Sequence, residues 1–352
     1  MSTNFPMTKR PRLDFMSDNT AGACPEAMSA LIAANGSFVA GYGADDTTKQ
    51  SADSIRRILN SDAEVRFVST GTAGNAIACA MLCRPYETIA ASECAHVLML
   101  EAGAPSFFGR GLQIEPIDGD LGRIRPEAFR VAVSVVRPPA RQRLSALSLT
   151  NATECGTIYD RNQFLEICGI AHEAGLGIHV DGARLVNAVA AGFDPKLIAA
   201  AGVDILVLSG SKAGAPFSEA VVLLNKSMAR GLDAHLKQAG QLASKTRFLA
   251  APWLGMLDGQ GDNIPWISHA RHANAMAKRI GARCPLPILY PVETNAVFIR
   301  MTDMQVRELA EKGWRLRLSP DGSMRVTCSW ATSTDAVDEL IADICAIAET
   351  RS

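Results

Sequence analysis

Short apolar runs recur along the first two thirds of the chain, and segments with helical apolar spacing separate most of them. A run of four to eight apolar residues between turn residues is typical of a buried strand, whereas apolar residues three and four positions apart are typical of an amphipathic helix. Seven runs predict strands: Val65–Thr70, Thr88–Ala91, Gln113–Ile117, Leu144–Thr150, Leu176–Asp181, Asp204–Leu208 and Ala220–Leu224.

The segments between these strands predict helices. They are Pro25–Asn35 and Ser54–Asn60 before the first strand, then Asn75–Cys83, Arg161–Ala174 and Leu185–Ala201. Strands that alternate with helices favour an α/β fold, in which a mostly parallel, doubly wound sheet carries helices on both faces. We therefore expect one seven-stranded sheet of this kind.

The pattern changes after about residue 235. A long helical stretch, Leu236–Leu257, and a helix at Trp266–Ile280 precede short strands at Ala296–Arg300 and Met324–Thr327. Helical spacing returns at Asp303–Lys312 and Thr334–Glu349. The chain thus divides into a disordered tail (1–12), a large domain (13–235) and a small C-terminal α+β domain (236–352).

Composition excludes several classes of partner. The 352 residues are 48% hydrophobic and carry a net charge of −1, so a sizeable core is available and nothing favours nucleic acid or an acidic membrane. No apolar stretch approaches the ~18 residues of a membrane span, and the first residues lack the apolar stretch of a signal peptide. The nine cysteines form no CxxC pair and no zinc spacing, which predicts a cytoplasmic protein without a metal.

Asp181 and Lys212 are the most informative pair. Asp181 ends one predicted strand and Lys212 follows the next, with a single helix between them. A right-handed crossover brings both groups to the carboxyl edge of the sheet, where open α/β sheets bind ligands. Pyridoxal 5'-phosphate needs a lysine for its Schiff base and an acid against its pyridinium nitrogen. The pair therefore predicts this cofactor.

Two further features are placed at the same edge. The glycine-rich segment 69–75 joins a strand to a helix, so it is either a structural turn or a phosphate site at the helix N-terminus. His96 follows another strand and is either a polar capping residue or a group that stacks on the cofactor and transfers protons.

Two arginines are candidate carboxylate ligands. Arg184 lies one helical turn past Asp181, and Arg325 lies in a strand of the small domain. Each is either an ordinary surface arginine or one half of a bidentate clamp on a substrate carboxylate.

Taken together, these segments resemble the threonine aldolase family of fold-type I pyridoxal-phosphate enzymes, relatives of the β-eliminating lyases, from about Phe15 to Ile344. The matching segments are 17–19, 42–45, 69–75, His96 with 101–103, 181–184, 209–212 and 325–327. Segments 242–248, 271–276 and 291–295 resemble the low-specificity and phenylserine aldolase branch.

The resemblance implies roles for individual residues. Lys212 would form the Schiff base, Asp181 would pair with the pyridine nitrogen and His96 would stack on the ring. The other implied roles are phosphate binding by Gly71, Thr72 and, from a neighbouring subunit, Arg247; substrate carboxylate binding by Ser17, Arg184 and Arg325; and lining of the site by Tyr42 across an interface. Homodimers or homotetramers with shared active sites are implied as well.

One departure from the family concerns the β-hydroxyl proton. Many members carry a second active-site histidine in the segment that corresponds to 151–156, where this chain has none and Asn151 is nearest to its place. His96 or an ordered water must then take the proton. The expected reaction is retro-aldol cleavage of L-threonine, L-allo-threonine or phenylserine-type amino acids to glycine and an aldehyde.

Three alternatives remain beside this reaction. A lyase of the same fold would eliminate a β-substituent instead. A nucleotide-binding dehydrogenase is disfavoured because segment 69–75 lacks the GxGxxG order. A catalytically silent relative is disfavoured because Asp181, His96, Arg184, Lys212 and Arg325 are all retained.

Overall fold

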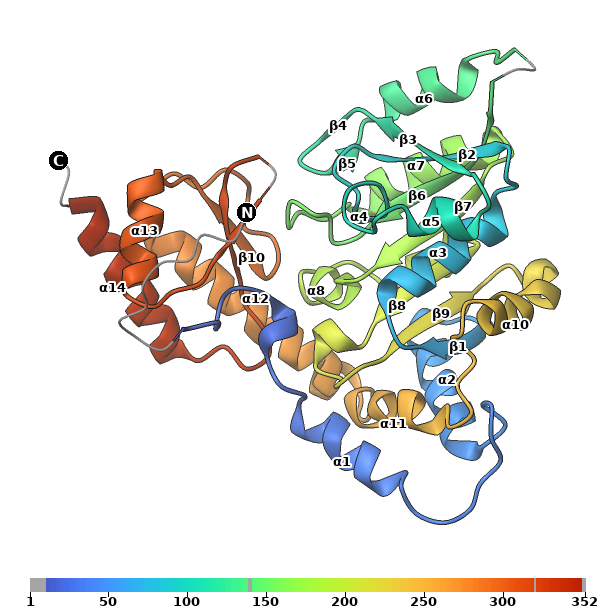
Figure 1. Cartoon of the computed structure of the whole chain (residues 1–352), viewed down its shortest axis with the longest axis horizontal. Coiled ribbons are helices and arrows are strands. Elements are labelled where there is room, and N and C mark those ends of the chain that lie inside the picture. Colours follow the sequence, from blue (N-terminus) through green and yellow to red (C-terminus); the bar gives the residue numbers. More distant parts are fainter. Residues whose placement is uncertain (1–10, 139–140, 320, 350–352) are drawn as a thin grey trace.

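The computed structural model describes residues 11–138, 141–319 and 321–349 (Figure 1). Of the predicted disordered tail, residues 1–10 lie outside the described residues. All seven predicted strands are confirmed in one sheet of order β1-β9-β8-β7-β6-β2-β3. Their bounds are β1 Glu64–Val68, β2 Glu87–Ser92, β3 Gln113–Ile117, β6 Arg143–Thr150, β7 Gly177–Gly182, β8 Ile205–Ser209 and β9 Glu219–Leu223.

The sheet is mostly parallel, as predicted. β3, β2, β6, β7 and β8 pair in parallel, and only β9 runs antiparallel to its neighbours β8 and β1. Because β1 and β8 are both antiparallel to β9, which lies between them, β1 points the same way as β8. The carboxyl ends of six strands therefore meet at one edge, where the candidate site residues were expected.

Helices cover both faces of this sheet. Val207 on β8 packs in a cluster with Ile77 of α3 (Gly71–Leu82) and Leu232 of α10 (Ala229–Gln238). Its neighbour Leu206 belongs to the cluster that includes Phe164 of α7 (Arg161–Glu173). Since successive side chains of a strand point to opposite faces, these two clusters lie on opposite sides of the sheet.

Two predicted helices are wrong as single elements, because a glycine breaks each of them. Leu185–Ala201 forms α8 (Leu185–Ala190) and α9 (Lys196–Ala200), with Gly192 between them at φ +110. Leu236–Leu257 forms the end of α10 and then α11 (Arg247–Met256), with Gly240 between them at φ +69. Left-handed backbone favours glycine and ends a helix.

The helix predicted at Ser54–Asn60 is longer than expected. It is α2, Asp46–Leu59, and the Asp45 side chain caps it by accepting from Thr48 N. Its first half buries Thr48 and Ser51, so the buried face begins with small polar residues. An apolar periodicity therefore appears only in its second half.

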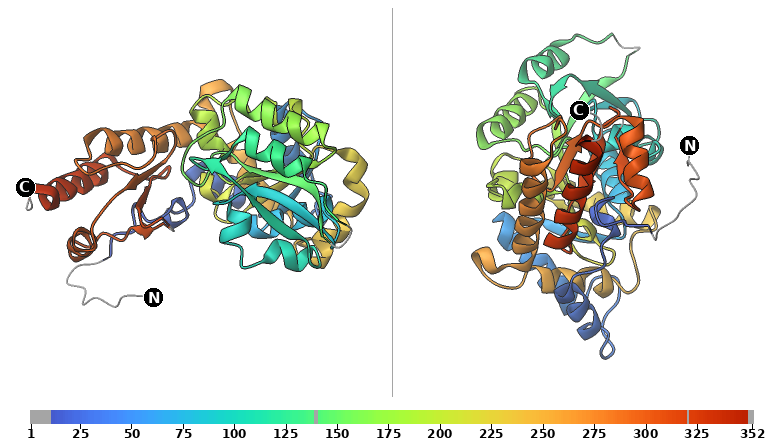
Figure 2. Two further views of the ribbon diagram at one scale, coloured as in Figure 1. Left: turned by 90° about the horizontal axis from the view of Figure 1, so that it is seen from above. Right: turned by 90° about the vertical axis from the view of Figure 1, so that its left-hand side faces the viewer.

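The C-terminal elements lie beside the large sheet (Figures 1 and 2). A three-stranded sheet of order β10-β12-β11 packs with three helices. These elements are β10 Ala296–Ile299, β11 Arg317–Leu318, β12 Met324–Thr327, α12 Pro265–Arg283, α13 Asp303–Glu311 and α14 Thr334–Glu349. α11 packs against α1 (Pro25–Ala33) and α2, while α12 contacts both α8 and α14. The division at residue 235 stays a prediction.

The N-terminal segment joins this C-terminal part. Phe15 is fully buried in its core, 5.5 Å from Trp314 between ring centroids, and Phe15 O accepts from Thr327 N. Residues 17 and 18 are thereby held next to β12. No helix in the described ranges is long and apolar enough to cross a membrane.

Further short elements had no counterpart in the sequence prediction. They are α4 His96–Met99, α5 Ala104–Phe108, α6 Pro126–Ser134, β4 Gly119–Asp120, β5 Arg123–Ile124, and the 3-10 turns η1 Asp18–Thr20, η2 Ser211–Ala213, η3 Lys226–Met228 and η4 Gly261–Asn263.

Candidate active site

Asp181 and Lys212 lie at the carboxyl ends of neighbouring parallel strands. Asp181 pairs with Val207 across β7 and β8, and Lys212 stands in η2, which directly follows β8. Asp181 is buried, and its Oδ1 accepts from Ala183 N at 2.8 Å. Lys212 N donates to Ser209 Oγ at 3.2 Å. The strand ends thus bring together the carboxylate and the amine that the sequence predicted.

A hydrogen-bonded network connects Asp181 to His96. Asn75 Nδ2, on α3, donates to Asp181 Oδ2 at 2.9 Å and to Glu101 Oε1 at 2.8 Å. The same Glu101 oxygen lies 2.9 Å from His96 Nδ1. The Glu101 side chain is 0% exposed, whereas that of His96 is 37% exposed. The histidine ring is therefore fixed at its inner edge and open at its outer edge.

A second glutamate holds the main chain of His96. Glu154 Oε1, in the loop after β6, accepts from His96 N at 2.7 Å and from Thr150 Oγ1 at 3.0 Å. Burial, together with Cys94 and Asp181 nearby, raises the pKa of Glu154 to about 8. Glu154 accordingly holds its proton more readily than an ordinary carboxyl group, and its Oε1 fixes the start of α4.

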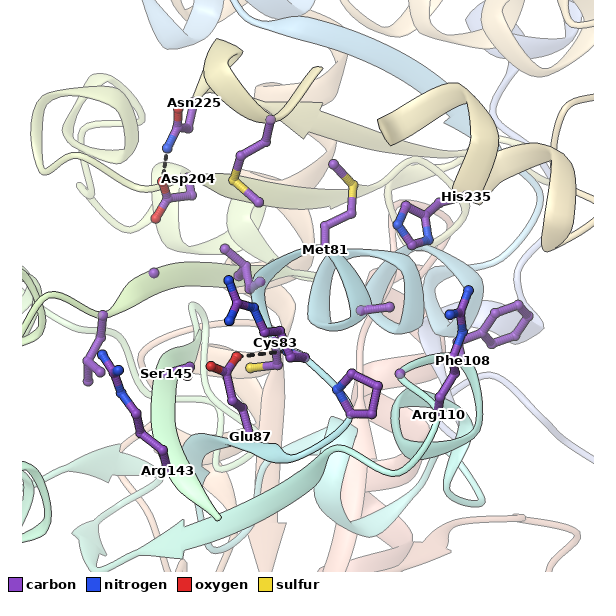
Figure 3. Close-up of a pocket in the computed structure, with 18 of the residues that line it drawn as sticks. Met81, Cys83, Glu87, Phe108, Arg110, Arg143, Ser145, Asp204, Asn225 and His235 are labelled. Atoms are coloured by element: carbon purple, nitrogen blue, oxygen red, sulfur yellow. Dashed lines mark hydrogen bonds between the residues drawn. The ribbon is translucent and has the colours of Figure 1, made fainter. Parts of the chain in front are cut away.

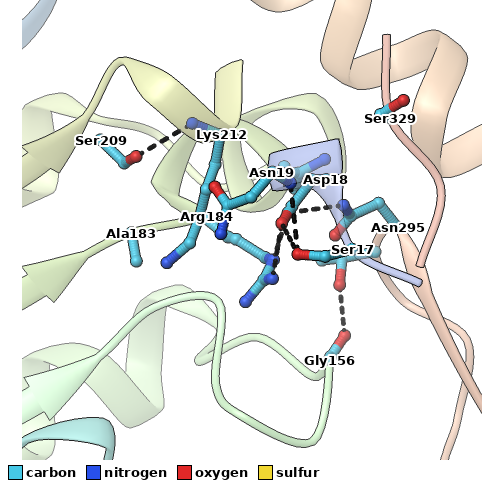
Figure 4. Close-up of polar contacts among 12 residues, drawn as sticks. Ser17, Asp18, Asn19, Gly156, Ala183, Arg184, Ser209, Lys212, Asn295 and Ser329 are labelled. Carbon is cyan, nitrogen blue, oxygen red and sulfur yellow. Dashed lines mark hydrogen bonds and ion pairs between the residues drawn. The ribbon is translucent and has the colours of Figure 1, made fainter. Parts of the chain in front are cut away.

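Arg184 has a partner that the sequence did not predict. Its Nε and Nη2 donate to the two carboxylate oxygens of Asp18, at 2.7 and 2.9 Å, and Asn295 Nδ2 also donates to Asp18 (Figure 4). Burial acts to lower the pKa of Arg184, but Asp18 outweighs it and raises that pKa. The pair therefore stays ionised, and both N–H groups of Nη1 and one of Nη2 are left for a ligand.

Asp18 stands at the centre of three cations. Burial acts to raise its pKa, but Arg184, Lys212 and Arg325 around it hold the pKa below its ordinary value. Ser17 Oγ, a predicted substrate ligand, donates to Asp18 Oδ1 at 3.3 Å. The N-terminal segment therefore supplies a carboxylate that brings the two candidate clamp arginines near the lysine.

Arg325 has an unpartnered nitrogen. Its Nε is shut off from solvent and has no hydrogen-bond partner in the part of the chain that the structure describes. Burial, together with Arg184 and Arg317 nearby, lowers the pKa of Arg325 to about 10. A buried, unsatisfied guanidinium N–H is costly unless an anion meets it. This observation favours a carboxylate ligand at Arg325.

The N-terminus of α3 lies at the same edge of the sheet. Thr70 caps the helix by accepting from Ala73 N, and a Cβ built on Gly71 would meet nothing within 4 Å. The first N–H groups of a helix have no partner inside it and attract anions. Gly71 and Thr72 thus stand at an open helix start that suits a phosphate.

Tyr42 and Arg247 form a separate group. Tyr42 N donates to Ser244 O, three residues before Arg247, and the Tyr42 side chain is 58% exposed. Arg247 Nε is buried, and none of the described residues bonds to it. Among the described residues, no hydrogen bond or ion pair joins either side chain to Lys212, Asp181 or His96, so a single subunit does not assemble every predicted site residue by direct contact.

Asn151 lies against Asp181 by its main chain. Asn151 N donates to Asp181 O at 3.1 Å, and its Oδ1 accepts from Tyr159 N at 3.2 Å. Its Nδ2 is buried with no partner among the residues described. The side chain is thus tied to the loop that follows it. Sequence reasoning gave no role to four residues of the site, although all of them lie inside segments it singled out: Asp18, Asn75, Glu101 and Glu154.

A cavity of about 800 Å³ lies at the other edge of the sheet (Figure 3). Glu87, Arg143 and Gly177, which line it, begin β2, β6 and β7. It therefore opens at the amino ends of the strands, away from Asp181 and Lys212. We do not place the candidate site there.

The sheet order and the paired aspartate and lysine define a class of protein, the fold-type I α/β proteins. The beta-eliminating lyase family model matches residues 14–304, and the chain belongs to that family. It is 38% identical to the low specificity L-threonine aldolase of Pseudomonas sp. (strain NCIMB 10558), over 95% of this chain and 97% of that protein. The Pseudomonas aeruginosa protein of the same name is also 38% identical, over 94% of this chain and 96% of its own length.

A solved structure agrees with these relatives. The threonine aldolase of Leishmania major superimposes with a TM-score of 0.88 at 26% identity, over 95% of this chain and 98% of that one. A Sphingomonas wittichii serine palmitoyltransferase, at 15% identity and a TM-score of 0.71, shares the fold alone. The family predicted from the sequence is therefore confirmed.

Proposed function

We propose that this protein is a pyridoxal-phosphate-dependent aldolase. It cleaves β-hydroxy-α-amino acids of the L-threonine, L-allo-threonine or phenylserine type to glycine and an aldehyde. One observation carries the proposal: Asp181, which is buried, and Lys212 lie at the same edge of the sheet in a chain that is 38% identical to low specificity L-threonine aldolases over nearly its whole length.

The residues at the sheet edge fit the cofactor. Lys212 offers the amine, Asp181 the buried carboxylate and His96 a ring fixed beside them. The open start of α3 at Gly71 and Thr72 suits the phosphate, and the unpartnered Nε of Arg247, from a neighbouring subunit, suits it as well. When bound, pyridoxal phosphate accepts the electrons of the bond that breaks at the substrate Cα.

The substrate carboxylate would be bound at the N-terminal segment and β12. Arg325 supplies the unpartnered Nε, Ser17 a hydroxyl, and Arg184 the nitrogen that Asp18 does not use. Arg184 also anchors Asp18, which lies close to Lys212 and Arg325. A fixed carboxylate fixes rotation about the Cα bonds, and this selects the bond that is cleaved.

The β-hydroxyl proton must leave as the Cα–Cβ bond breaks. His96 is the group proposed to accept it, because its outer ring edge is exposed while Glu101 holds the inner edge. A single positioned base contributes about 10²–10⁴-fold to a rate.

β-Elimination is the second candidate, because the matching family model is that of the beta-eliminating lyases. The two reactions give different products. We expect glycine with acetaldehyde from threonine and glycine with benzaldehyde from phenylserine. Pyruvate and ammonia from serine or cysteine, with no glycine from either β-hydroxy substrate, would establish elimination instead.

Lys212→Ala is the control for the cofactor. Borohydride should fix pyridoxal phosphate to wild-type Lys212 and leave the variant unlabelled. A label on another lysine would contradict the assignment.

We also propose an oligomer with shared sites, a homodimer or homotetramer, in a reducing, cytoplasmic compartment. Tyr42 is exposed, and Arg247 Nε is buried with no hydrogen-bond partner among the described residues, as expected for residues that complete a neighbour's site. All nine cysteines are free thiols, which suits reducing conditions.

A further inference from the structure

The His96 ring is held by one oxygen of a fully buried carboxylate. Glu101 Oε1 lies 2.9 Å from His96 Nδ1 and accepts from Asn75 Nδ2 at 2.8 Å. The other oxygen, Oε2, is buried and has no partner among the described residues. Within that part of the chain the Glu101 carboxylate therefore bonds only to His96 and Asn75.

The position of the hydrogen between His96 and Glu101 follows from Asn75. Its Nδ2 lies between two carboxylate oxygens, of Glu101 and Asp181, and a side-chain amide has two N–H donors. Turning the amide around would place its oxygen against both carboxylates, which is repulsive. Glu101 Oε1 thus acts as an acceptor, and the hydrogen shared with His96 lies on Nδ1.

The other charged groups around the ring leave this arrangement intact. Oxygens of Asp181 and Glu101 and a ring nitrogen of His96 lie within 4.8 Å of one another, but both Asp181 oxygens already accept, from Asn75 and from Ala183. Glu154 accepts from the main chain of His96 and not from its ring. Glu101 is therefore the group that selects the tautomer.

We propose that Glu101 is a positioning residue that fixes neutral His96 as the Nδ1–H tautomer. The lone pair of Nε2 is then presented on the open side of the ring as the base for the β-hydroxyl proton. In this step the substrate O–H bond breaks, an Nε2–H bond forms, and the Glu101 carboxylate stabilises the charged ring. The role of Nε2 rests on the proposed function, whereas the tautomer does not.

Two substitutions separate the acceptor from the charge. Both hydrogen bonds end on a single oxygen, so Glu101→Gln can keep both of them while removing the charge. Glu101→Met has a similar length and removes the acceptor. The matched control is Glu115→Gln on β3, whose carboxylate pairs with Arg137 away from the site.

The primary measurement is ¹⁵N NMR of histidine-labelled protein, with and without added pyridoxal phosphate, in which His96→Gln identifies the His96 signals. We expect a protonated Nδ1 in the wild type, in Glu101→Gln and in Glu115→Gln, and a shift to the Nε2–H tautomer in Glu101→Met. A wild-type His96 protonated on Nε2, or metal-bound at Nδ1, overturns the proposal without any variant. An unchanged tautomer in folded Glu101→Met overturns it too.

Kinetics then test the consequence. Glu101→Met should lower kcat on threonine or phenylserine by about 10²-fold, the lower end of a general-base contribution, with little change in KM. The kcat of Glu101→Gln should lie between that of Glu101→Met and that of the wild type. Equal kcat in all variants overturns the link from Glu101 to the base. A wild type with the expected tautomer but no cleavage of either substrate refutes the proposed function and leaves the tautomer assignment standing.

Discussion

Arg325 carries the clearest prediction at the scale of single residues. Its Nε is buried and meets no partner in the described ranges, and burial with Arg184 and Arg317 nearby lowers its pKa to about 10. It still remains charged at neutral pH. Binding of an anion strongly stabilises a cation in this state, because the ligand accepts a hydrogen bond from an N–H that the protein leaves unsatisfied.

We expect Arg325→Ala to lower kcat/KM on threonine by about 10²-fold or more, as for the loss of a charged, bidentate contact. Spectroscopic binding of pyridoxal phosphate should change little. The control is Arg317→Ala, since Arg317 is exposed and pairs with Arg325 across β11 and β12. Near-normal efficiency of Arg325→Ala, or an equal loss in both variants, would rule out the clamp.

Residue roles could be predicted where local position determines them. Asp181 and Lys212 follow strand ends, so the parallel sheet alone brings them to one edge. Asp18 could not be found in this way, because its partner Arg184 lies 166 positions away and the contact depends on how the N-terminal segment packs. Glu101 shows the same limit, since only the folded loop reveals that its carboxylate meets His96 and Asn75.

At the scale of elements, buried strands were the most reliable prediction. The burial patterns of β8 and β9 are continuous, and such apolar runs are easily recognised. Helix bounds failed where the buried face is polar, as at Ser51 in α2, or where one glycine stops a helix, as at Gly192 and Gly240. Very short helices such as α4 have too few residues to show a period.

The packing of α3 on β8 depends on Gly74. A Cβ added there would lie 2.8 Å from Val207 Cγ1, a branched and fully packed side chain. We expect Gly74→Ala to lower the free energy of unfolding by about 1–3 kcal/mol, the usual cost of overpacking. It should also weaken phosphate binding, because α3 must move away from the sheet edge.

Gly169→Ala is the matched control for Gly74→Ala. Gly169 lies inside α7, and a Cβ there would meet nothing within 4 Å. This change should raise stability by about 0.5–1 kcal/mol, because alanine is the better helix former. Denaturant unfolding of both variants tests the argument, and equal effects at the two glycines would refute it.

At the scale of the whole molecule, the remaining question is which chain completes which site. Lys212 and Arg325 of one subunit both lie near its Asp18. Tyr42 bonds to Ser244, three residues before Arg247. Tyr42 and Phe38, in the loop between α1 and α2, are exposed. An exposed apolar loop beside an unpartnered arginine favours an interface with a second copy. We therefore expect Arg247 to serve the neighbouring subunit's site.

Mixing inactive variants tests this arrangement. If sites are shared, a heterodimer of Lys212→Ala and Arg247→Ala subunits has one site with both lesions and one site with neither. Random reassociation of equal amounts should restore about one quarter of the wild-type activity, since half of the dimers are mixed and each carries one intact site. The control is Lys212→Ala with Arg325→Ala. Both of these residues belong to one subunit's site, so every site keeps a lesion and no activity returns. Recovery in neither mixture, with exchange verified by mass spectrometry, would mean that Arg247 acts within its own chain.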